Sequence, residues 1–347
     1  MVRLSRGAKS ALRSLAASST YGFWSRLPLG RGMVKILTYH RVLPERPPAG
    51  EFVQPGMYVT EAAFERQLGY LRRAFTVLSV KEMLQLWDEG LWSDRERYAV
   101  ITFDDGWVDT FRHAFPILRS HGVPATVFLP TERIGTNHWF WPDRLGHLLT
   151  RHGLGSREAR LQIMTSLPGY QVGPEIHPEA PEEEEIDAMI EACKKLPAET
   201  IEAMIDDVVR RSGLPDPASE RCLLTWEEVE IMGRQGISFG SHAATHRILT
   251  GLPPQEVRRE LESSLAALRD RRVNVVVALA YPNGNHDASV RECARLAGYR
   301  AAFTTRPGTE GRAPEDRFAL KRIGVHQDIA KTEPLFAFHL GRPRGAR

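Results

Sequence analysis

Short apolar runs alternate along this chain with segments in which apolar residues recur at helical spacing. The runs that predict strands are 34–39, 98–103, 125–129, 236–240, 273–280, 300–304 and 318–325. The segments that predict helices are 60–74, 79–90, 108–121, 225–236, 261–268 and 289–297. Such alternation indicates parallel strands joined by crossover helices, which is an α/β fold.

The pattern changes between residues 133 and 222. This stretch has helical spacing and no strand signal, and the glutamates at 182–185 begin an acidic segment that is typical of a solvated helix face. We therefore expect a basic N-terminal segment at 1–33, a (β/α) domain at 34–340 interrupted by a helical insertion at 133–222, and a basic tail at 341–347.

Composition narrows the class of protein only slightly. The chain has 347 residues, of which 42% are hydrophobic and 26% charged, and this is ordinary globular usage. A net charge of +3 gives no indication of nucleic-acid binding. The cysteines Cys193, Cys222 and Cys293 are scattered and odd in number, so they indicate neither a disulfide framework nor a cysteine-rich zinc site.

Residues 1–32 contain six basic residues and no acidic one. They lack the uninterrupted apolar core of a signal peptide, and no segment reaches the roughly 20 apolar residues of a membrane span. Two interpretations stay open: an amphipathic basic helix on an anionic membrane surface, or a basic tail. The expected location is cytoplasmic, with peripheral contact at the inner face of the membrane under the first interpretation.

Two adjacent carboxylates, Asp104 and Asp105, follow the strand predicted at 98–103 and precede Gly106. A strand end followed by glycine can bend so that both side chains reach one cavity. Carboxylates that close together are rarely both ionised without a cation or a raised pKa. A metal ion on one and a catalytic proton on the other would resolve this conflict. Alternatively, the pair simply caps the helix predicted at 108–121.

Two histidines, His242 and His246, follow the strand predicted at 236–240. On a helical turn this spacing places both imidazoles on one face, where they can bind one divalent ion. Two histidines and one carboxylate leave coordination positions open for water and substrate, as hydrolysis requires. Both motifs lie at carboxyl ends of strands, where (β/α) barrels form their active sites.

These residues carry a resemblance to a known family. The segments 102–106 and 241–246 resemble the first two motifs of the polysaccharide deacetylases, the family 4 carbohydrate esterases, and 278–284 resembles the third. The resemblance implies a distorted (β/α) barrel of about seven parallel strands with a helical insertion. It also implies a metal-dependent hydrolase that removes N-acetyl groups from an amino sugar in a polysaccharide, oligosaccharide or lipid-linked glycan.

The resemblance assigns a role to each motif residue. Asp105, His242 and His246 would hold a divalent metal ion, with zinc expected. Asp104 would be the general base that takes a proton from a metal-activated water. The tetrahedral oxyanion needs a further donor, and because Pro282 has no N–H, the backbone N–H of Asn283 is the candidate.

The general acid has two candidates, because a histidine ends both an early and a late predicted strand. His40 follows 34–39 within a Tyr-His-Arg-Val segment, and His326 follows 318–325. Typical family members place the acid on a late strand, whereas the segment around His40 resembles a subgroup of exopolysaccharide deacetylases with circularly shifted strands. We favour His40 and keep His326 as the alternative.

One departure from the family pattern concerns the base. The third motif normally carries an arginine two places before its proline, but that position here is Ala280. Another residue must then set the pKa of Asp104, and Arg322 is a candidate. A convincing aspartate–tryptophan fourth motif is also absent.

Two other functions stay open. A carbohydrate-binding relative without chemistry would be expected to lack Asp104 or a metal ligand, and all of these residues are present. A hydrolase for another C–N bond, such as a formamide on a lipid- or nucleotide-linked sugar, agrees with the basic N-terminus. Release of formate instead of acetate would distinguish the latter.

Overall fold

The computed structural model describes residues 30–45, 47, 52–54, 56–150, 183–194, 196–212, 221–271 and 273–341. The chain forms two compact units. The first comprises Met1–Glu45, Tyr58–Gly135 and Leu224–Arg347, and the second comprises Arg46–Met57 and Thr136–Leu223. The helical stretch at 133–222 supplies most of the second unit, and residues 46–57, which the sequence pattern did not single out, belong to it as well.

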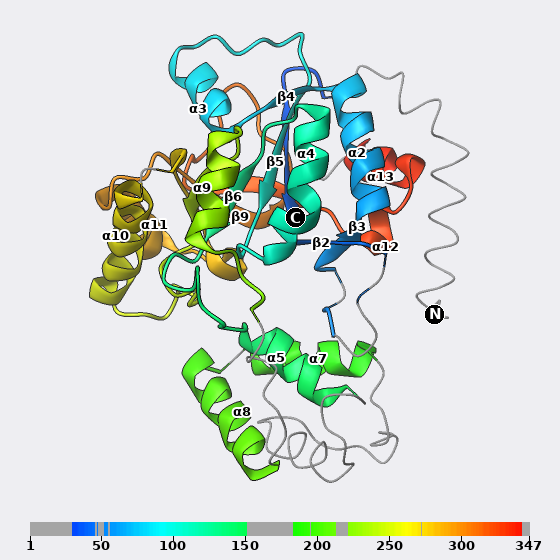
Figure 1. Ribbon diagram of the computed structural model, residues 1–347. Coiled ribbons are helices and arrows are strands. Elements are labelled where there is room, and N and C mark those ends of the chain that lie inside the picture. Colours follow the sequence, from blue (N-terminus) through cyan, green and yellow to red (C-terminus); the bar gives the residue numbers. More distant parts are fainter. Residues whose placement is uncertain are drawn as a thin grey trace, which may run out of the picture. The chain divides into compact units, whose positions relative to one another are not determined.

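The first unit is a parallel barrel, as expected from the sequence (Figure 1). Its strands are β1 (Val34–Tyr39), β5 (Tyr98–Phe103), β6 (Thr126–Leu129), β7 (Ser238–Ser241), β8 (Val275–Ala280), β9 (Ala301–Pro307) and β10 (Leu320–Gly324). Every neighbouring pair is parallel, and the pairing of β1 with both β10 and β5 closes the ring. The short strand β4 (Thr76–Leu78) pairs in parallel with the first half of β5, at residues 98–100.

Neither β4 nor two further short strands were predicted. These two are β2 (Arg41–Leu43) and β3 (Tyr58–Thr60), which pair in parallel outside the barrel sheet. Three residues give too short a run for periodicity to indicate a strand. Their pairing places the segment after His40 beside the start of a helix, α2 (Glu61–Ala74).

The helices of the barrel unit follow the strands, as the alternating pattern predicted. They are α2, α3 (Val80–Asp88), the π-helical turn η1 (Thr110–Ala114) continuing into α4 (Phe115–His121), α9 (Trp226–Arg234), α10 (Pro254–Asp270), α11 (Ala288–Leu296), α12 (Gln327–Ala330) and α13 (Glu333–Gly341). Capping boxes at Ser79 and Thr225 begin α3 and α9.

Alternation of side chains along the strands separates two apolar clusters. One fills the barrel and includes Ile36, Val100, Phe128, Ala278 and Phe303. The other lies between the strands and the surrounding helices and includes Leu37, Ile101, Val127, Phe239 and, from α2, Phe64. Continuing this alternation past the strand ends places the side chains of His40 and Asp104 on the barrel side.

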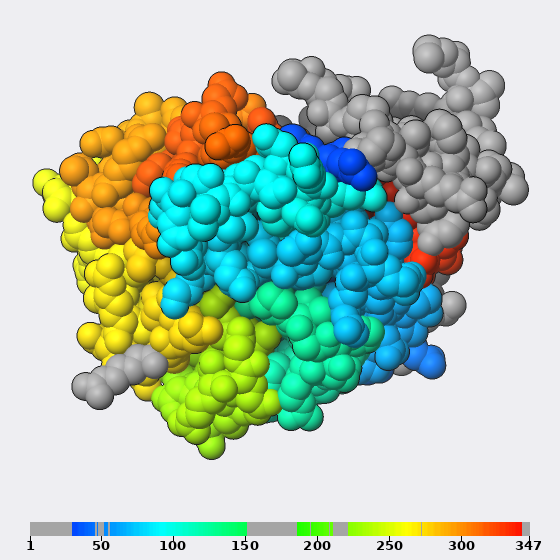
Figure 2. Space-filling model, turned by 90° about the horizontal axis from the view of Figure 1, so that it is seen from above, coloured from blue at the N-terminus to red at the C-terminus, as the bar shows by residue number. Residues whose placement is uncertain are grey.

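The amino end of the barrel is covered by α3 and the loop that follows it. Met83, Leu84 and Trp87 of α3 belong to the cluster inside the barrel. Trp92 of the loop donates a hydrogen bond from its indole to the carbonyl of Gly32, 2.9 Å away. Figure 2 views this end, where the cyan atoms of α3 and its loop cover the centre of the face. The carboxyl end is therefore the one available for chemistry.

The capping box of α3 gives a first testable prediction. The Ser79 hydroxyl accepts a hydrogen bond from the backbone N–H of Glu82, and the Glu82 carboxylate accepts one from the N–H of Ser79. We expect Ser79→Ala to lower the free energy of unfolding of the barrel unit by about 1 kcal/mol, measured by urea denaturation. Lys81→Ala, at an exposed position of the same helix, serves as control, and an equal effect of the two changes would contradict the assignment.

The second unit is helical where it is described. It contains α5 (Trp141–Leu149), α7 (Glu183–Cys193) and α8 (Ala198–Ser212). These helices share a core of their own, which includes Leu145, Leu148, Ile186, Ile190 and Ile201. Phe52 joins this core, and a Cβ on Gly146 would lie 2.0 Å from the Phe52 ring. This contact explains why the distant segment around residue 52 belongs to the helical unit.

No helix among the described residues is long and apolar enough to cross a bilayer. The expectations for the basic N-terminus and for nearly all of the tail concern residues 1–29 and 342–347, which lie outside the described residues.

Candidate metal centre

A left-handed turn after β5 separates the two adjacent aspartates. Asp105 and Gly106 have φ values of 72° and 70°. A Cβ on Gly106 would lie 2.9 Å from side-chain atoms of Leu129 and Ile134, so this position needs glycine for space as well as for conformation. The turn lets Asp104 and Asp105 make separate sets of contacts at the carboxyl end of the barrel.

The segment that carries the two histidines is a loop, so the prediction of a helical turn is wrong. β7 ends at Ser241, and residues 242–246 have no helical assignment. Ala243 and His246 instead adopt left-handed conformations, with φ values of 61° and 68°. The ring centroids of His242 and His246 are still 4.8 Å apart, because the loop folds back on itself.

The structure brings Asp105, His242 and His246 together, as the sequence predicted. Asp105 Oδ1 lies 3.3 Å from His242 Nε2 and 3.2 Å from His246 Nε2. The candidate ligand atoms of the three residues all lie within 4.8 Å of one another. Donors bound to one zinc ion at ordinary bond lengths stand about 3.3 Å apart, so this set fits a divalent ion.

In His242 and Asp105, the polar atom that does not face the other candidate ligands has a hydrogen-bond partner of its own. The Nδ1–H of His242 donates to the carbonyl of Ala280, 2.7 Å away, and Nε2 is the ring nitrogen that faces Asp105. The indole N–H of Trp107 donates to Asp105 Oδ2 at 3.0 Å, which leaves Oδ1 toward the histidines. Partners of this kind orient metal ligands and select the histidine tautomer.

Trp107 was not singled out from the sequence, since a tryptophan just after a glycine turn is more often a packing residue. The guanidinium of Arg41 lies over the Trp107 ring, 4.8 Å from the ring centroid. Arg41 Nε also donates to Asp109 Oδ2 at 2.5 Å. The Tyr-His-Arg-Val segment therefore supports the acid motif directly, through a buried arginine.

Asp104 is paired with Arg322, the candidate that the missing motif arginine suggested. Its Oδ1 accepts from Arg322 Nη1 at 2.8 Å and its Oδ2 from Nη2 at 2.6 Å. The guanidinium reaches the site from β10, is 1% exposed, and donates from Nε to the carbonyl of Thr304. A bidentate pair of this kind fixes the orientation of the carboxylate as well as its charge.

The electrostatics keep both aspartates ionised. Burial alone would raise the pKa of Asp104, but the positive charges of Arg322 and His242 outweigh it and hold the pKa below its ordinary value. Burial would also raise the pKa of Asp105, but hydrogen bonds from His242 and His246 hold it well below the usual range. Arg322 thus chiefly compensates the charge of Asp104, and hydrogen bonding with the two histidines compensates that of Asp105.

The two candidate acids lie on neighbouring strands. Tyr39 of β1 pairs with Phe103 of β5, and the N–H of Asp104 donates to the Tyr39 carbonyl at 3.0 Å, so His40 is level with Asp104. The charge of His40 contributes to the lowered pKa of both aspartates. His326 follows β10, where its Nδ1 lies 3.5 Å from Asp328 Oδ2.

Asn283 lies in the 3-10 turn η3 (Pro282–Gly284), directly after β8. It has a left-handed φ of 56° and is exposed, and its side chain donates to Asn285 Oδ1 at 2.9 Å. The carbonyl of Ala280, three residues earlier, holds His242. The third motif thus lies beside the candidate metal ligands and contacts His242 through a backbone carbonyl.

Solved structures share this fold. Streptococcus pyogenes deacetylase PplD in complex with acetate aligns with a TM-score of 0.56 and 18% identity over 88% of this chain and 96% of its own. IcaB from Ammonifex degensii aligns with a TM-score of 0.55 and 18% identity over 88% and 97%.

Curated relatives match parts of the sequence. YxkH of Bacillus subtilis is 22% identical over 230 residues, which are 66% of this chain and 52% of the relative. The poly-beta-1,6-N-acetyl-D-glucosamine N-deacetylase of Staphylococcus epidermidis is 30% identical over 112 residues, 30% of this chain and 38% of that enzyme. The chain thus spans about half or less of the length of these relatives.

The family model described as polysaccharide deacetylase matches residues 93–302. That range contains both aspartates, both histidines and the third motif, which the barrel brings to one end. This chain belongs to the polysaccharide deacetylase family.

Proposed function

We propose that this protein is a metal-dependent hydrolase that removes N-acetyl groups from an amino sugar in a polysaccharide, oligosaccharide or lipid-linked glycan. One observation carries the proposal: three ligand atoms converge within 4.8 Å while a fourth group, the carboxylate of Asp104, is held apart by Arg322. Hydrolysis of an amide needs both an electrophilic centre and a separate base. A protein that only binds carbohydrate has no need of this division.

The side chains divide the reaction as follows. Asp105, His242 and His246 would hold a divalent ion, for which we propose zinc, and this ion would polarise the amide carbonyl and lower the pKa of a bound water. Asp104 accepts the proton of the attacking water, and Arg322 keeps the Asp104 carboxylate ionised and oriented. The backbone N–H of Asn283 donates to the developing oxyanion.

His40 donates the proton to the departing amine in this proposal. Its position beside Asp104 and its effect on the pKa of both aspartates support it over His326. We include in the proposal that the chain belongs to the subgroup with the Tyr-His-Arg-Val segment. The interaction of Arg41 with Trp107 gives that segment a second role at the site.

We take the proposed substrate class from the name of a curated relative. The Staphylococcus epidermidis protein is named for poly-beta-1,6-N-acetyl-D-glucosamine, so an N-acetylated glucosamine polymer or its lipid-linked precursor is the first substrate to test. A lipid-linked substrate agrees with a cytoplasmic protein that contacts the membrane surface through residues 1–32, which we include in the proposal.

The test is incubation of the full chain, loaded in turn with zinc and with other divalent ions, with N-acetylated oligosaccharides and lipid-linked amino sugars. Free acetate and free amine should appear in equal amounts. Release of formate from N-formylated sugars without acetate from the N-acetylated ones would favour the alternative hydrolase. Glycan binding without any product would favour a carbohydrate-binding relative.

Replacement of each candidate acid separates their roles. We expect His40→Ala to lower kcat on an N-acetylated sugar by about 100-fold and His326→Ala to change it little. An activated aryl acetate needs no proton on its leaving group, so His40→Ala should retain most of its activity toward that ester. Equal losses on both substrates would argue against His40 as the acid, and a larger loss for His326→Ala would reassign the role.

A further inference from the structure

The buried face of α10 contains two polar residues where apolar ones would be expected. Val257, Leu261 and Leu265 on this face are buried in an apolar cluster, yet Glu260 and Ser264, one turn apart, are buried beside them. A buried carboxylate is costly unless hydrogen bonds compensate for lost water. The partners of these two side chains therefore indicate why they are there.

Both side chains are bonded to the segment that carries the candidate histidine ligands. Glu260 Oε2 accepts from the backbone N–H of Ala244 at 3.0 Å and of Thr245 at 2.9 Å. Its Oε1 accepts from the Thr245 hydroxyl at 2.6 Å. The Ser264 hydroxyl is 2.7 Å from that of Ser241, which in turn accepts from the N–H of Ala243.

The carbonyl groups of the same loop are held from the opposite side. The N–H groups of Thr131 and Glu132 donate to the carbonyls of Ala243 and Ala244, at 3.3 and 2.9 Å, and the Arg133 Nε–H donates to that of Thr245. The loop is thus fixed on both sides by hydrogen bonds.

This support matters because the loop is strained. Left-handed conformations at Ala243 and His246 cost about 1–2 kcal/mol each for residues other than glycine. Such conformations persist only where surrounding contacts hold them.

We propose that Glu260 is a positioning residue for the candidate metal centre: by holding residues 244 and 245, it keeps His246 Nε2 beside Asp105 before any ion binds. The assignment rests on the metal centre of the proposed function. Without the carboxylate, the strained loop would relax, and metal binding would have to order it again. Removal of the Glu260 carboxylate should therefore weaken metal binding, and this effect can be measured independently of catalysis.

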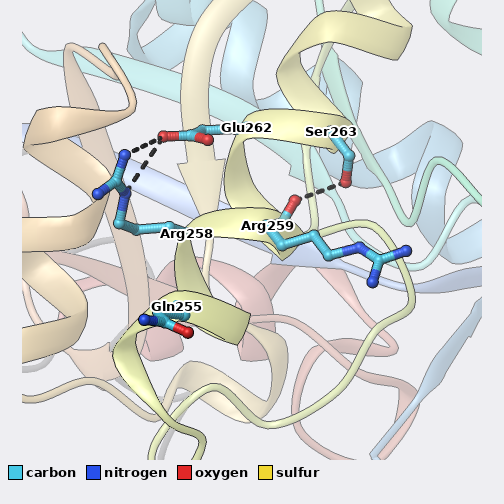
Figure 3. A pocket seen from close by; sticks show the side chains of 5 residues that line it. All are labelled: Gln255, Arg258, Arg259, Glu262 and Ser263. Atoms are coloured by element: carbon cyan, nitrogen blue, oxygen red, sulfur yellow. Dashed lines mark hydrogen bonds and ion pairs between the residues drawn. The ribbon is translucent and has the colours of Figure 1, made fainter.

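The test measures metal affinity of the full chain by competition with a chromophoric chelator. We expect Glu260→Ala to weaken zinc binding by about 10- to 100-fold. The matched control is Glu262→Ala on the outer side of the same helix. Glu262 pairs there with Arg258 at 3.2 Å, among the residues that line a shallow pocket (Figure 3). This change should leave zinc affinity unaltered.

Two further variants separate positioning from folding. The amide oxygen in Glu260→Gln can still accept from both backbone N–H groups while its NH2 donates to the Thr245 hydroxyl, so this variant should restore most of the affinity. Thr245→Val removes one of the three bonds and should give a smaller loss than Glu260→Ala. The absorption spectrum of the cobalt-loaded protein should differ from that of the unmodified chain least for Glu260→Gln, more for Thr245→Val and most for Glu260→Ala.

The outcomes are distinct. A folded Glu260→Ala protein with the zinc affinity of the unmodified chain would overturn the assignment of Glu260 and leave the metal centre intact. An unmodified chain that binds no divalent ion would overturn the metal centre and the assignment together. If Glu260→Ala does not fold, wild-type affinity in Thr245→Val would count against the assignment.

Discussion

Replacing Asp104 with asparagine is expected to lower kcat by about 10²- to 10⁴-fold, the usual contribution of a general base, while metal content stays unchanged. The reason is the division of contacts at the two adjacent aspartates. Asp105 faces the histidines, whereas both oxygens of Asp104 face Arg322. Loss of the Asp104 charge should therefore remove the proton acceptor and leave all three candidate ligands in place. Deacetylation kinetics and metal analysis of the same preparation check this.

The control is His242→Ala, which should lose both bound metal and turnover. Asp104→Asn also leaves the buried guanidinium of Arg322 without a counter-charge, so the folded fraction must be measured and kcat expressed per folded molecule. Near-normal turnover in folded Asp104→Asn would show that another group is the base. Loss of metal in this variant would show that Asp104 is itself a ligand.

Replacing Arg322 with methionine is expected to lower the free energy of unfolding by about 3–5 kcal/mol, the usual cost of removing one partner of a buried ion pair. Asp104 and Arg322 are 2% and 1% exposed, so no solvent is available to stabilise the remaining carboxylate. Urea denaturation followed by fluorescence provides the measurement. Arg322→Lys keeps the charge but cannot make both contacts, so its free energy of unfolding should lie between those of the unmodified chain and Arg322→Met.

A double replacement isolates the pair itself. Two apolar residues of suitable size in place of a buried ion pair are often neutral for stability, so Asp104→Leu with Arg322→Met should regain most of what Arg322→Met loses. This double variant should have no deacetylase activity. The double variant could instead lose as much free energy of unfolding as Asp104→Leu and Arg322→Met lose together. The two side chains would then not stabilise each other, and the role given to Arg322 would be wrong.

Much of the fold could be predicted because its signals are local. The run that becomes β5 is almost continuously apolar, since every residue of this strand is buried. The position of both motifs after strands also followed from the sequence, and parallel pairing then brings Asp105 and His242 to one end.

The details that were missed depend on tertiary contacts. Spacing alone suggested a helical turn for His242 and His246, but the hydrogen bonds to Glu260 and to residues 131–133 stabilise a loop there instead. Trp107 gave no signal, because its hydrogen bond to Asp105 depends on the left-handed turn between them. The partner of Asp104 lies 218 positions away, and only the missing motif arginine pointed to it.

Closure of the ring between β1 and β5 has a consequence for how such chains are compared. Because β1 sits between β10 and β5, the beginning and the end of the barrel sequence are spatial neighbours. A proton donor can then be encoded near either end of the barrel sequence and still lie at almost the same point of the barrel's carboxyl end. Linear order is a poor guide to equivalence in this architecture, and alignments that start at the first motif will overlook groups contributed from upstream of it.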